Sequence, residues 1–212
     1  MKIVLRILLV AAIAALVYMC VESVMSPIRF DAEKENREKP IVERLIDIRD
    51  AQIGFRNMHG VYAGSFTELE KFLNEEKIPF LSKEGELTEE HLKQGLTEKE
   101  AVKKGIIKRD TTWVLAKDTL LGAGYNVAEI GKVPGLKESS SFVLDTATMS
   151  SPSGYTVPVF ECSVSYETYL GDLDRQLLFN LNDRQEKLKR FCGLKVGSVT
   201  EINNNAGNWE QF

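Results

Sequence analysis

The residues with the clearest potential for chemistry are two cysteines in the second half of the chain. Cys162 ends a predicted strand and Cys192 ends a predicted helix, so the two thiols meet if that helix packs back on the sheet. A disulfide between them would close a loop of about 30 residues and restrict the unfolded chain. The alternative is that both are separate buried thiols, which behave as small apolar side chains.

Other reactive side chains are few. The chain has two histidines, His59 at a predicted helix end and His91 on a polar segment, and we interpret them as a turn residue and a surface residue. The acidic pairs Glu75-Glu76 and Glu89-Glu90 lie on predicted solvated faces. Asn203–Asn205 could offer oxygen ligands to calcium but is more typical of a turn. The sequence has no phosphate loop, dinucleotide fingerprint, zinc-ligand spacing or hydrolase motif, so we predict no catalytic residue, no cofactor and no metal site.

One stretch near the N-terminus is long and apolar enough to cross a bilayer. As a helix, Ile3–Met25 would span roughly 34 Å, against a hydrocarbon core of about 30 Å. Lys2 and Arg6 precede the uncharged part, so the positive-inside rule places the N-terminus in the cytoplasm. We interpret residues 1–25 as an uncleaved signal anchor of a single-pass inner-membrane protein, with residues 26–212 in the periplasm, where disulfides can persist.

Two other interpretations of this N-terminal segment stay open. One is a lipoprotein modified at Cys20, and the other is a signal peptide that is removed. Both expect small residues near the processing site, whereas this sequence has Tyr18, Met19 and Val21 there.

Composition excludes several classes of protein. The 212 residues are 43% hydrophobic and 27% charged, which is ordinary for a folded domain and excludes a fully disordered chain. The single apolar stretch excludes a multi-span membrane protein. The formal net charge of −4 argues against nucleic acid as a main ligand. The expected partners are the lipid bilayer and either other envelope proteins or further copies of this chain.

The region after the anchor divides into a short segment and a longer domain. Residues 26–39 carry many charges of both signs and form a linker or the start of the next helix, and residues 40–212 form an extracytoplasmic domain. From Pro40, apolar residues recur at helical spacing, with Leu45, Ile48, Gln52 and Phe55 on one face. The pattern predicts an amphipathic helix that ends within Asn57–Gly60 and buries this face against a sheet.

Short helices are predicted next. Ser65 and Glu68 have the spacing of a capping box, which opens a helix with Phe66, Leu69, Phe72 and Leu73 inward and with its end before Pro79. Two further short helices are predicted between residues 85 and 105, where Thr residues precede acidic turns and Gly residues follow them.

The composition then favours strands. Four segments rich in β-branched and aromatic residues are separated by Gly and Pro, which predicts an antiparallel meander over 111–116, 125–133, 141–148 and 155–164. Pro158 favours an edge position in the last of them. After Gly171, leucines at helical spacing predict a helix that stops near Gly193, and 194–200 would add a final strand. The fold class is therefore α+β, with a transmembrane helix leading into an amphipathic helix packed on an antiparallel sheet.

Residues Leu45–Leu73, LIDIRDAQIGFRNMHGVYAGSFTELEKFL, resemble the body of bacterial type IV pilins and type II secretion pseudopilins. The resemblance implies a membrane helix that continues into an amphipathic helix and a sheet that packs on it. The N-terminus lacks the Gly and the FTLIE-like start at which a prepilin peptidase cuts. The stretches Gly193–Ser198 and Asn204–Glu210 are similar to single-span bacterial envelope proteins of uncharacterised function.

These observations predict a membrane-anchored, non-enzymatic structural or assembly component of a bacterial envelope complex, pilin-like in architecture. The alternative is an envelope binding module for a partner protein, peptide or glycan. An apolar stripe left uncovered on the two amphipathic helices would favour assembly, an exposed aromatic surface would favour binding, and two close, buried carboxylates in a pocket would favour an enzyme.

Overall fold

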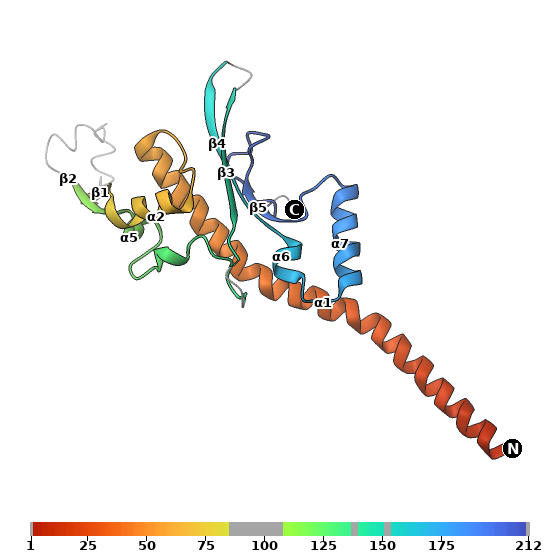
Figure 1. Cartoon of the computed structure of the whole chain (residues 1–212). Helices are drawn as coiled ribbons and strands as arrows, with labels where there is room; N and C mark the ends of the chain where they lie inside the picture. Colours follow the sequence, from red (N-terminus) through yellow and green to blue (C-terminus); the bar gives the residue numbers. More distant parts are fainter. Residues whose placement is uncertain (1, 85–107, 137–139, 151–153, 211–212) are drawn as a thin grey trace, which may run out of the picture. The chain divides into compact units, whose positions relative to one another are not determined.

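A computed structural model describes residues 2–84, 108–136, 140–150 and 154–210 of the chain. These residues form helices and antiparallel sheets, which confirms the α+β class (Figure 1). The chain divides into two compact units, one made of residues 1–46 with 131–212 and the other of residues 47–130. The two short helices predicted between residues 85 and 105 lie outside the described residues.

The N-terminal helix α1 (Lys2–His59) is continuous through both prolines that it contains, Pro27 and Pro40. Residues 26–39, predicted as a linker or the start of the next helix, are therefore the middle of one continuous helix. Ion pairs between side chains four residues apart stabilise this charged stretch; they are Glu33–Arg37, Lys34–Glu38 and Glu35–Lys39. The helix ends where it was predicted to end, at Gly60, which has a φ of +78° and donates its N–H to the carbonyl of Arg56.

The first unit combines the N-terminal part of α1 with a three-stranded sheet and two helices. The sheet has the order β3 (Val143–Ser150), β4 (Thr156–Ser165), β5 (Gly193–Gly197), and both pairings are antiparallel. Helices α6 (Tyr166–Leu170) and α7 (Arg175–Lys187) lie between β4 and β5 in the chain. The core of this unit includes the fully buried side chains of Ile41, Leu45, Phe160, Tyr169, Leu170 and Val196.

The second unit combines the C-terminal part of α1 with α2 (Phe66–Glu75) and a two-stranded hairpin of β1 (Lys77–Glu84) and β2 (Lys108–Leu115). The helix α5 (Ala116–Leu120) and a single 3₁₀ turn, η1 (Val127–Glu129), follow. Its core is formed by side chains of α1 and α2 together with Ile130; they are Ile48, Ala51, Phe55, Leu69, Phe72 and Leu73.

The predicted capping box at the start of α2 is present. The Ser65 hydroxyl accepts the backbone N–H of Glu68 at 3.3 Å, and the Glu68 carboxylate accepts the N–H of Gly64 at 2.9 Å. Phe55 is buried as predicted, but its aromatic contact is with α2, where its ring lies 5.3 Å from that of Phe72. The sheet was therefore the wrong partner for this side chain.

The predicted meander of four strands is wrong. Residues 111–115 of the first predicted segment belong to β2, which pairs with β1, and residue 116 begins α5. The segment 125–133 holds the turn η1 instead of a strand. The sequence did not predict β1 because it contains Pro79; a two-stranded hairpin tolerates this residue because each strand has one unpaired edge. Pro158 lies in the part of β4 that pairs with β3 alone, so its local edge position agrees with the prediction.

The last helix is shorter than predicted. Asp174 caps α7 by accepting the N–H groups of Gln176 and Leu177, and the helix ends at Lys187. Leu178 is its buried residue, whereas Leu188 is 55% exposed. Lys189 has a φ of +53°, which turns the chain out of the helix before β5 begins at Gly193.

Candidate functional site

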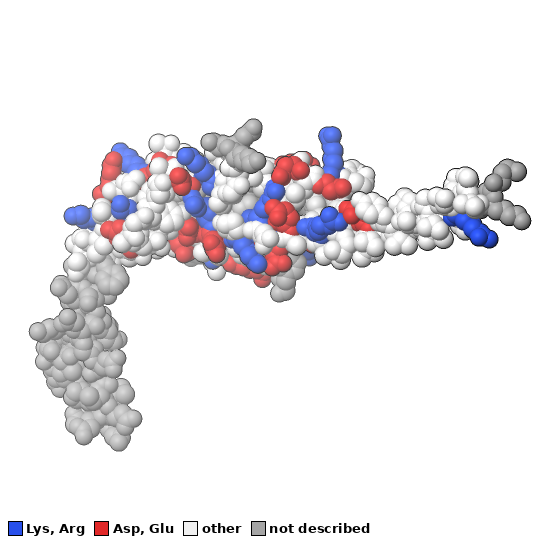
Figure 2. Space-filling view, turned by 90° about the horizontal axis from the view of Figure 1, so that it is seen from below, with Lys and Arg blue, Asp and Glu red and all other residues white. Residues whose placement is uncertain are grey.

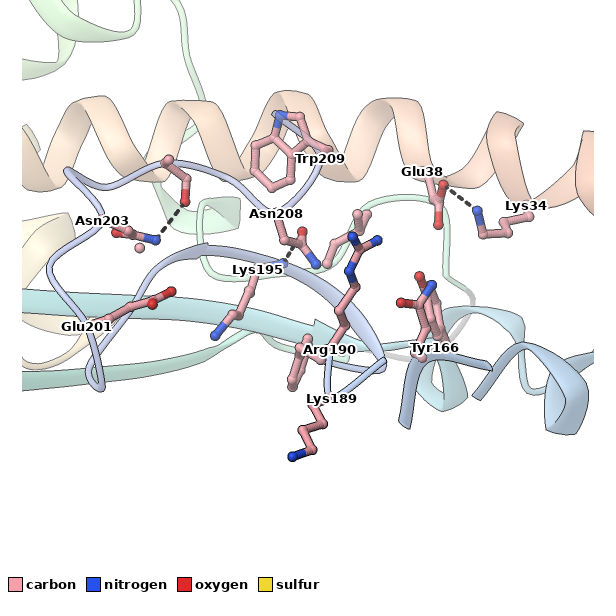
Figure 3. Close-up of a pocket in the computed structure, with 15 residues that line it drawn as sticks. Lys34, Glu38, Tyr166, Lys189, Arg190, Lys195, Glu201, Asn203, Asn208 and Trp209 are labelled. Carbon is pink, nitrogen blue, oxygen red and sulfur yellow. Dashed lines mark hydrogen bonds and ion pairs between the residues drawn. The ribbon is translucent and has the colours of Figure 1, made fainter. Parts of the chain in front are cut away.

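A pocket of about 330 Å³ lies in the first unit (Figure 3). Helix α1 contributes Lys34 and Glu38 to one side, and α6 contributes Tyr166. The remaining walls come from the segment that follows α7, from β5 and from the C-terminal segment. Their side chains are Lys189, Arg190, Phe191, Leu194, Lys195, Glu201, Asn203, Asn208 and Trp209.

The C-terminal wall is held in place by asparagine side chains. The Asn203 amide accepts the N–H of Asn205 at 3.1 Å and donates to the carbonyl of Ala206 at 3.2 Å. Asn204 and Asn205 have φ values of +55° and +61°, a conformation that asparagine tolerates better than most residues. This confirms the interpretation of Asn203–Asn205 as a turn.

A second asparagine fastens this segment to β5. Asn208 donates to the carbonyl of Gly193 at 2.8 Å and accepts the N–H of Lys195 at 3.1 Å. Gly207 forms an isolated bridge with Val196, and a Cβ atom at Gly207 would stand 2.5 Å from the ring of Trp209. A glycine is therefore required where Trp209 folds over the backbone at the pocket wall.

Two of the cations in the pocket are neutralised by neighbouring acids. Lys34 lies 3.1 Å from Glu38, and Lys195 lies 3.1 Å from Glu161 on β4. Each ammonium group also lies over an aromatic ring, with Lys34 6.0 Å from the centre of Tyr166 and Lys195 5.8 Å from that of Phe191. These contacts hold both lysines along the walls.

Arg190 differs from these two lysines. Within the part of the chain that the structure describes, its guanidinium makes no hydrogen bond or ion pair. Figure 3 shows the side chain pointing into the space bordered by Asn208, Glu38 and Tyr166. A guanidinium presents several donors in one plane, which suits a carboxylate or phosphate group. Arg190 is therefore the group in the pocket best placed to bind an anion.

The acidic and phenolic groups of the pocket do not form an acid–base pair. Glu38 accepts the hydroxyl of Tyr169 at 2.9 Å in addition to its pairing with Lys34, and Glu201 is exposed. Burial, with the nearby Glu38 charge, raises the pKa of Tyr166 to about 12. This hydroxyl therefore stays protonated at neutral pH and can donate a hydrogen bond.

The predicted disulfide between Cys162 and Cys192 is not formed, and both thiols are free. Gly193 pairs with Ser165 across β4 and β5, so Cys192 lies beside Tyr166, whose N–H donates to the Cys192 carbonyl. Cys162 pairs with Val196, four residues beyond Cys192, so the two cysteines lie about 13 Å apart at the usual rise of a strand. A disulfide needs Cα atoms within about 7 Å. The fully buried Cys162 agrees with the alternative of a packing thiol.

The histidines and possible metal ligands were also located. His59 is the last residue of α1, stacks on Phe55 with ring centres 4.3 Å apart, and lies 3.1 Å from the Glu76 carboxylate. His91 lies outside the described residues. Among the described residues, no group of three or more His, Cys, Asp and Glu side chains could hold a metal ion.

The N-terminal part of α1 is a second feature with functional meaning. Its most apolar 18-residue window has a mean hydropathy of 2.4, and none of that window is buried by the rest of the protein. Figure 2 shows this stretch as almost free of charged side chains, in contrast to the surface that follows it. By length and composition, α1 is the one described helix that can cross a membrane.

Sequence reasoning did not predict the pocket. Lys189, Arg190 and Phe191 fell within the helix that was predicted to stop near Gly193, and Asn203–Asn205 was interpreted as a turn. The available signal was the combination of the basic and aromatic residues Lys189–Phe191 with the Asn-Ala-Gly-Asn-Trp segment at 205–209, which returns to β5. No family model, curated protein or solved structure matches the chain. Its function must therefore be argued from its own geometry.

Proposed function

We propose that this protein is a non-enzymatic binding protein, anchored in the inner membrane by α1, whose periplasmic part binds an anionic ligand in the pocket between α1, α6 and β5. The N-terminus is cytoplasmic, because Lys2 and Arg6 precede the apolar run. The observation that carries the proposal is Arg190, a cation that points into the pocket and has no partner among the described residues.

The surroundings of Arg190 support a ligand with both an acidic group and a flat or apolar body. Phe191 and Trp209 are half-buried at the pocket wall, so their rings can cover such a body. Tyr166 and Gln185 supply further polar contacts. An acidic peptide and an acidic sugar share this chemistry.

The non-enzymatic part of the proposal rests on the state of the carboxylates. An acid–base pair needs two carboxyl groups that face each other across bound substrate. In this pocket, Glu38 is bound by Lys34 and Tyr169, and Glu201 is exposed. The arrangement therefore favours binding over hydrolysis.

Assembly with other membrane helices is the second proposal. It rests on the apolar stretch of α1, which no other described residue covers. In the periplasmic part of α1 and in α2, the apolar stripe is buried, as Ile41, Leu45, Ile48 and Leu73 show. A pilin-like assembly would therefore use the membrane-spanning part of α1 as its contact surface.

The binding proposal is tested with the full chain in lipid nanodiscs, in a Trp113→Phe background that leaves Trp209 as the remaining tryptophan. Trp209 fluorescence is titrated with hexaglutamate, with tetragalacturonate and with inorganic phosphate. We expect saturable binding of the peptide or the sugar acid, and at least a tenfold loss of affinity in Arg190→Gln.

The matched control for this titration is Arg184→Gln, which removes an exposed arginine of α7 outside the pocket. It should bind like the parent chain. Equal loss in both variants would show a general charge effect, and no saturable response to any probe would overturn anionic binding. The orientation is tested separately with a reporter that works only in the cytoplasm, which should be silent when fused after Phe212.

A further inference from the structure

Helix α1 has no break beyond Met25, so the position of each later residue along the helix gives its distance from the end of the apolar span. An α-helix rises 1.5 Å per residue. If the hydrocarbon core ends near Met25, each later residue of α1 has a fixed height above it. Ser26 then lies about 1.5 Å beyond this edge and Asn36 about 16 Å beyond it. A residue that packs against a given turn of α1 therefore lies at about the same distance from this edge as that turn.

The connection between α6 and α7 contacts this part of α1. Leu173 and Asp174 line an open pocket of about 460 Å³ together with residues of α1 from Ser26 to Asn36. The polar headgroup layer is about 5–8 Å thick on each side of a bilayer of ordinary dimensions. The half of the pocket next to Ser26 therefore falls within this layer.

Arg37, about 18 Å beyond the same edge, ties the connection to α1 above this layer. Its guanidinium donates to the carbonyl of Tyr169 at 2.8 Å and to both carboxylate oxygens of Asp172. Two residues further on, Asp174 caps α7. The α6 side of the connection is thus tied to α1, and α7 begins directly after it.

The exposed residues here have the chemistry of a membrane interface. Ile28 is 54% exposed on α1 and Phe179 is 64% exposed one turn into α7, while Phe30 forms an apolar part of the pocket. The Arg29 side chain is exposed on α1, where it pairs with Glu22 at 2.7 Å, and the Arg175 side chain is exposed at the start of α7. Aromatic and basic side chains are favoured at the level of the headgroups, where an apolar body and a charged end can both be solvated.

We infer that the end of this pocket next to Ser26 opens into the headgroup layer of the leaflet from which α1 emerges, and that phospholipid occupies the space between Ser26 and Leu173, while the end of the connection held by Arg37 lies above that layer. The inference depends on the proposal that α1 spans the membrane. The bilayer is the occupant that the geometry favours, because the pocket begins one residue beyond the apolar span. The contact sets the height of the binding domain above the membrane.

The test uses the full chain in phospholipid vesicles, with Trp113 and Trp209 replaced by Phe and one tryptophan introduced at a time. The three positions are Leu173→Trp in the pocket, Ile13→Trp in the middle of the span, and Tyr155→Trp as a matched exposed control, since Tyr155 is 75% exposed at the start of β4. Fluorescence quenching is compared between lipids brominated near the headgroup and lipids brominated deep in the acyl chain.

We expect Leu173→Trp to be quenched at least twofold more by the shallow bromines than by the deep ones, and Ile13→Trp to show the reverse order. Tyr155→Trp should be quenched by neither. Quenching of Ile13→Trp with none at Leu173→Trp would overturn the headgroup contact and keep the anchor. Absence of quenching at Ile13→Trp would overturn the anchor and this inference together. If the tryptophan-free background does not fold, difference quenching against the parent chain gives the same comparison.

Discussion

The side-chain amide of Gln52 is paired with the backbone of Ala63 through both of its polar ends. Nε2 donates to the Ala63 carbonyl at 3.0 Å, and Oε1 accepts the Ala63 N–H at 2.9 Å. Neither residue has exposed surface. The chain between Gly60 and Ser65 pairs with no strand. The Gln52 side chain therefore supplies the hydrogen bonds that the buried N–H and C=O of Ala63 need.

Replacing Gln52 by Leu should destabilise the protein strongly. The change leaves a buried N–H and a buried C=O without partners, each at a cost of about 1–3 kcal/mol. The free energy of unfolding should therefore fall by about 2–5 kcal/mol in denaturant titrations. Gln176→Leu, at an exposed position of α7, should change it by no more than about 0.5 kcal/mol. Equal effects of the two substitutions would contradict the role of the Gln52 pair.

Phe55→Ala should lower the melting temperature by many degrees. Phe55 is 4% exposed and packs against Phe72 and His59. Truncating a buried Phe typically costs about 3–5 kcal/mol. The control is Met58→Ala in the same helix, because Met58 is 41% exposed. Melting curves from circular dichroism should separate the two variants clearly; overlapping curves would mean that the Phe55 ring is not part of the core.

Arg37→Ala should loosen α6 from α1. The substitution removes hydrogen bonds to Tyr169 and Asp172 and an ion pair with Glu33. A hydrogen bond to a charged group typically contributes about 1.5–3 kcal/mol, and less where the partner is as exposed as the Asp172 side chain. Lys39→Ala breaks an exposed pair with Glu35, which is worth little in water. Amide hydrogen exchange in Tyr166–Leu170 should accelerate in the first variant and stay unchanged in the second.

The thiols should behave as separate groups. A count on the unreduced, denatured full chain should find three free cysteines, and a count of one would restore the disulfide between Cys162 and Cys192. In the folded protein, burial raises the pKa of the Cys162 thiol above its usual range. Less thiolate is then present at a given pH, and the residue has no exposed surface, so Cys162 should resist alkylation at pH 8 while half-buried Cys192 reacts.

Stability should fall at alkaline pH in a way that depends on Tyr166. Its pKa is raised to about 12 in the folded protein, whereas an unfolded tyrosine titrates near pH 10. The folded state therefore holds this proton more tightly, and the contribution to stability is complete below about pH 10 and lost as pH rises to about 12. Denaturant titrations of the wild type should show a steeper loss over this range than those of Tyr166→Phe. Parallel pH profiles would contradict burial of the hydroxyl.

Local signals in the sequence predicted local structure well. The end of α1 at Gly60, the capping box of Ser65 and Glu68, and the burial of Leu45 and Ile48 all follow from helical spacing and capping chemistry, which involve residues close in the chain. The strand at 143–150 and its partner at 156–165 followed from β-branched composition and an intervening turn.

The misassigned features depend on contacts between distant residues. Pro79 argued against predicting strand β1, and the partner of this strand, β2, lies more than 20 residues later in the sequence. The pocket brings α1 together with a C-terminal segment more than 160 residues away in the chain, as in the pair Lys34 and Trp209. Hydrogen bonds between the Asn208 side chain and the backbone of β5 hold the C-terminal segment at the pocket, and no periodic pattern in the sequence predicts them. The disulfide prediction failed for the same reason, since strand register decides the separation of the two cysteines.

Because α1 is unbroken past Met25, tilting its proposed membrane-spanning part displaces the residues that follow it. Transmembrane helices tilt by about 20° on average. Ile41 stands about 24 Å along the helix from Met25, so a tilt of that size displaces it sideways by about 8 Å. If α1 spans the membrane as proposed, a change in bilayer thickness that alters its tilt would therefore move the sheet of the first unit, and the proposed ligand pocket with it, relative to the membrane surface.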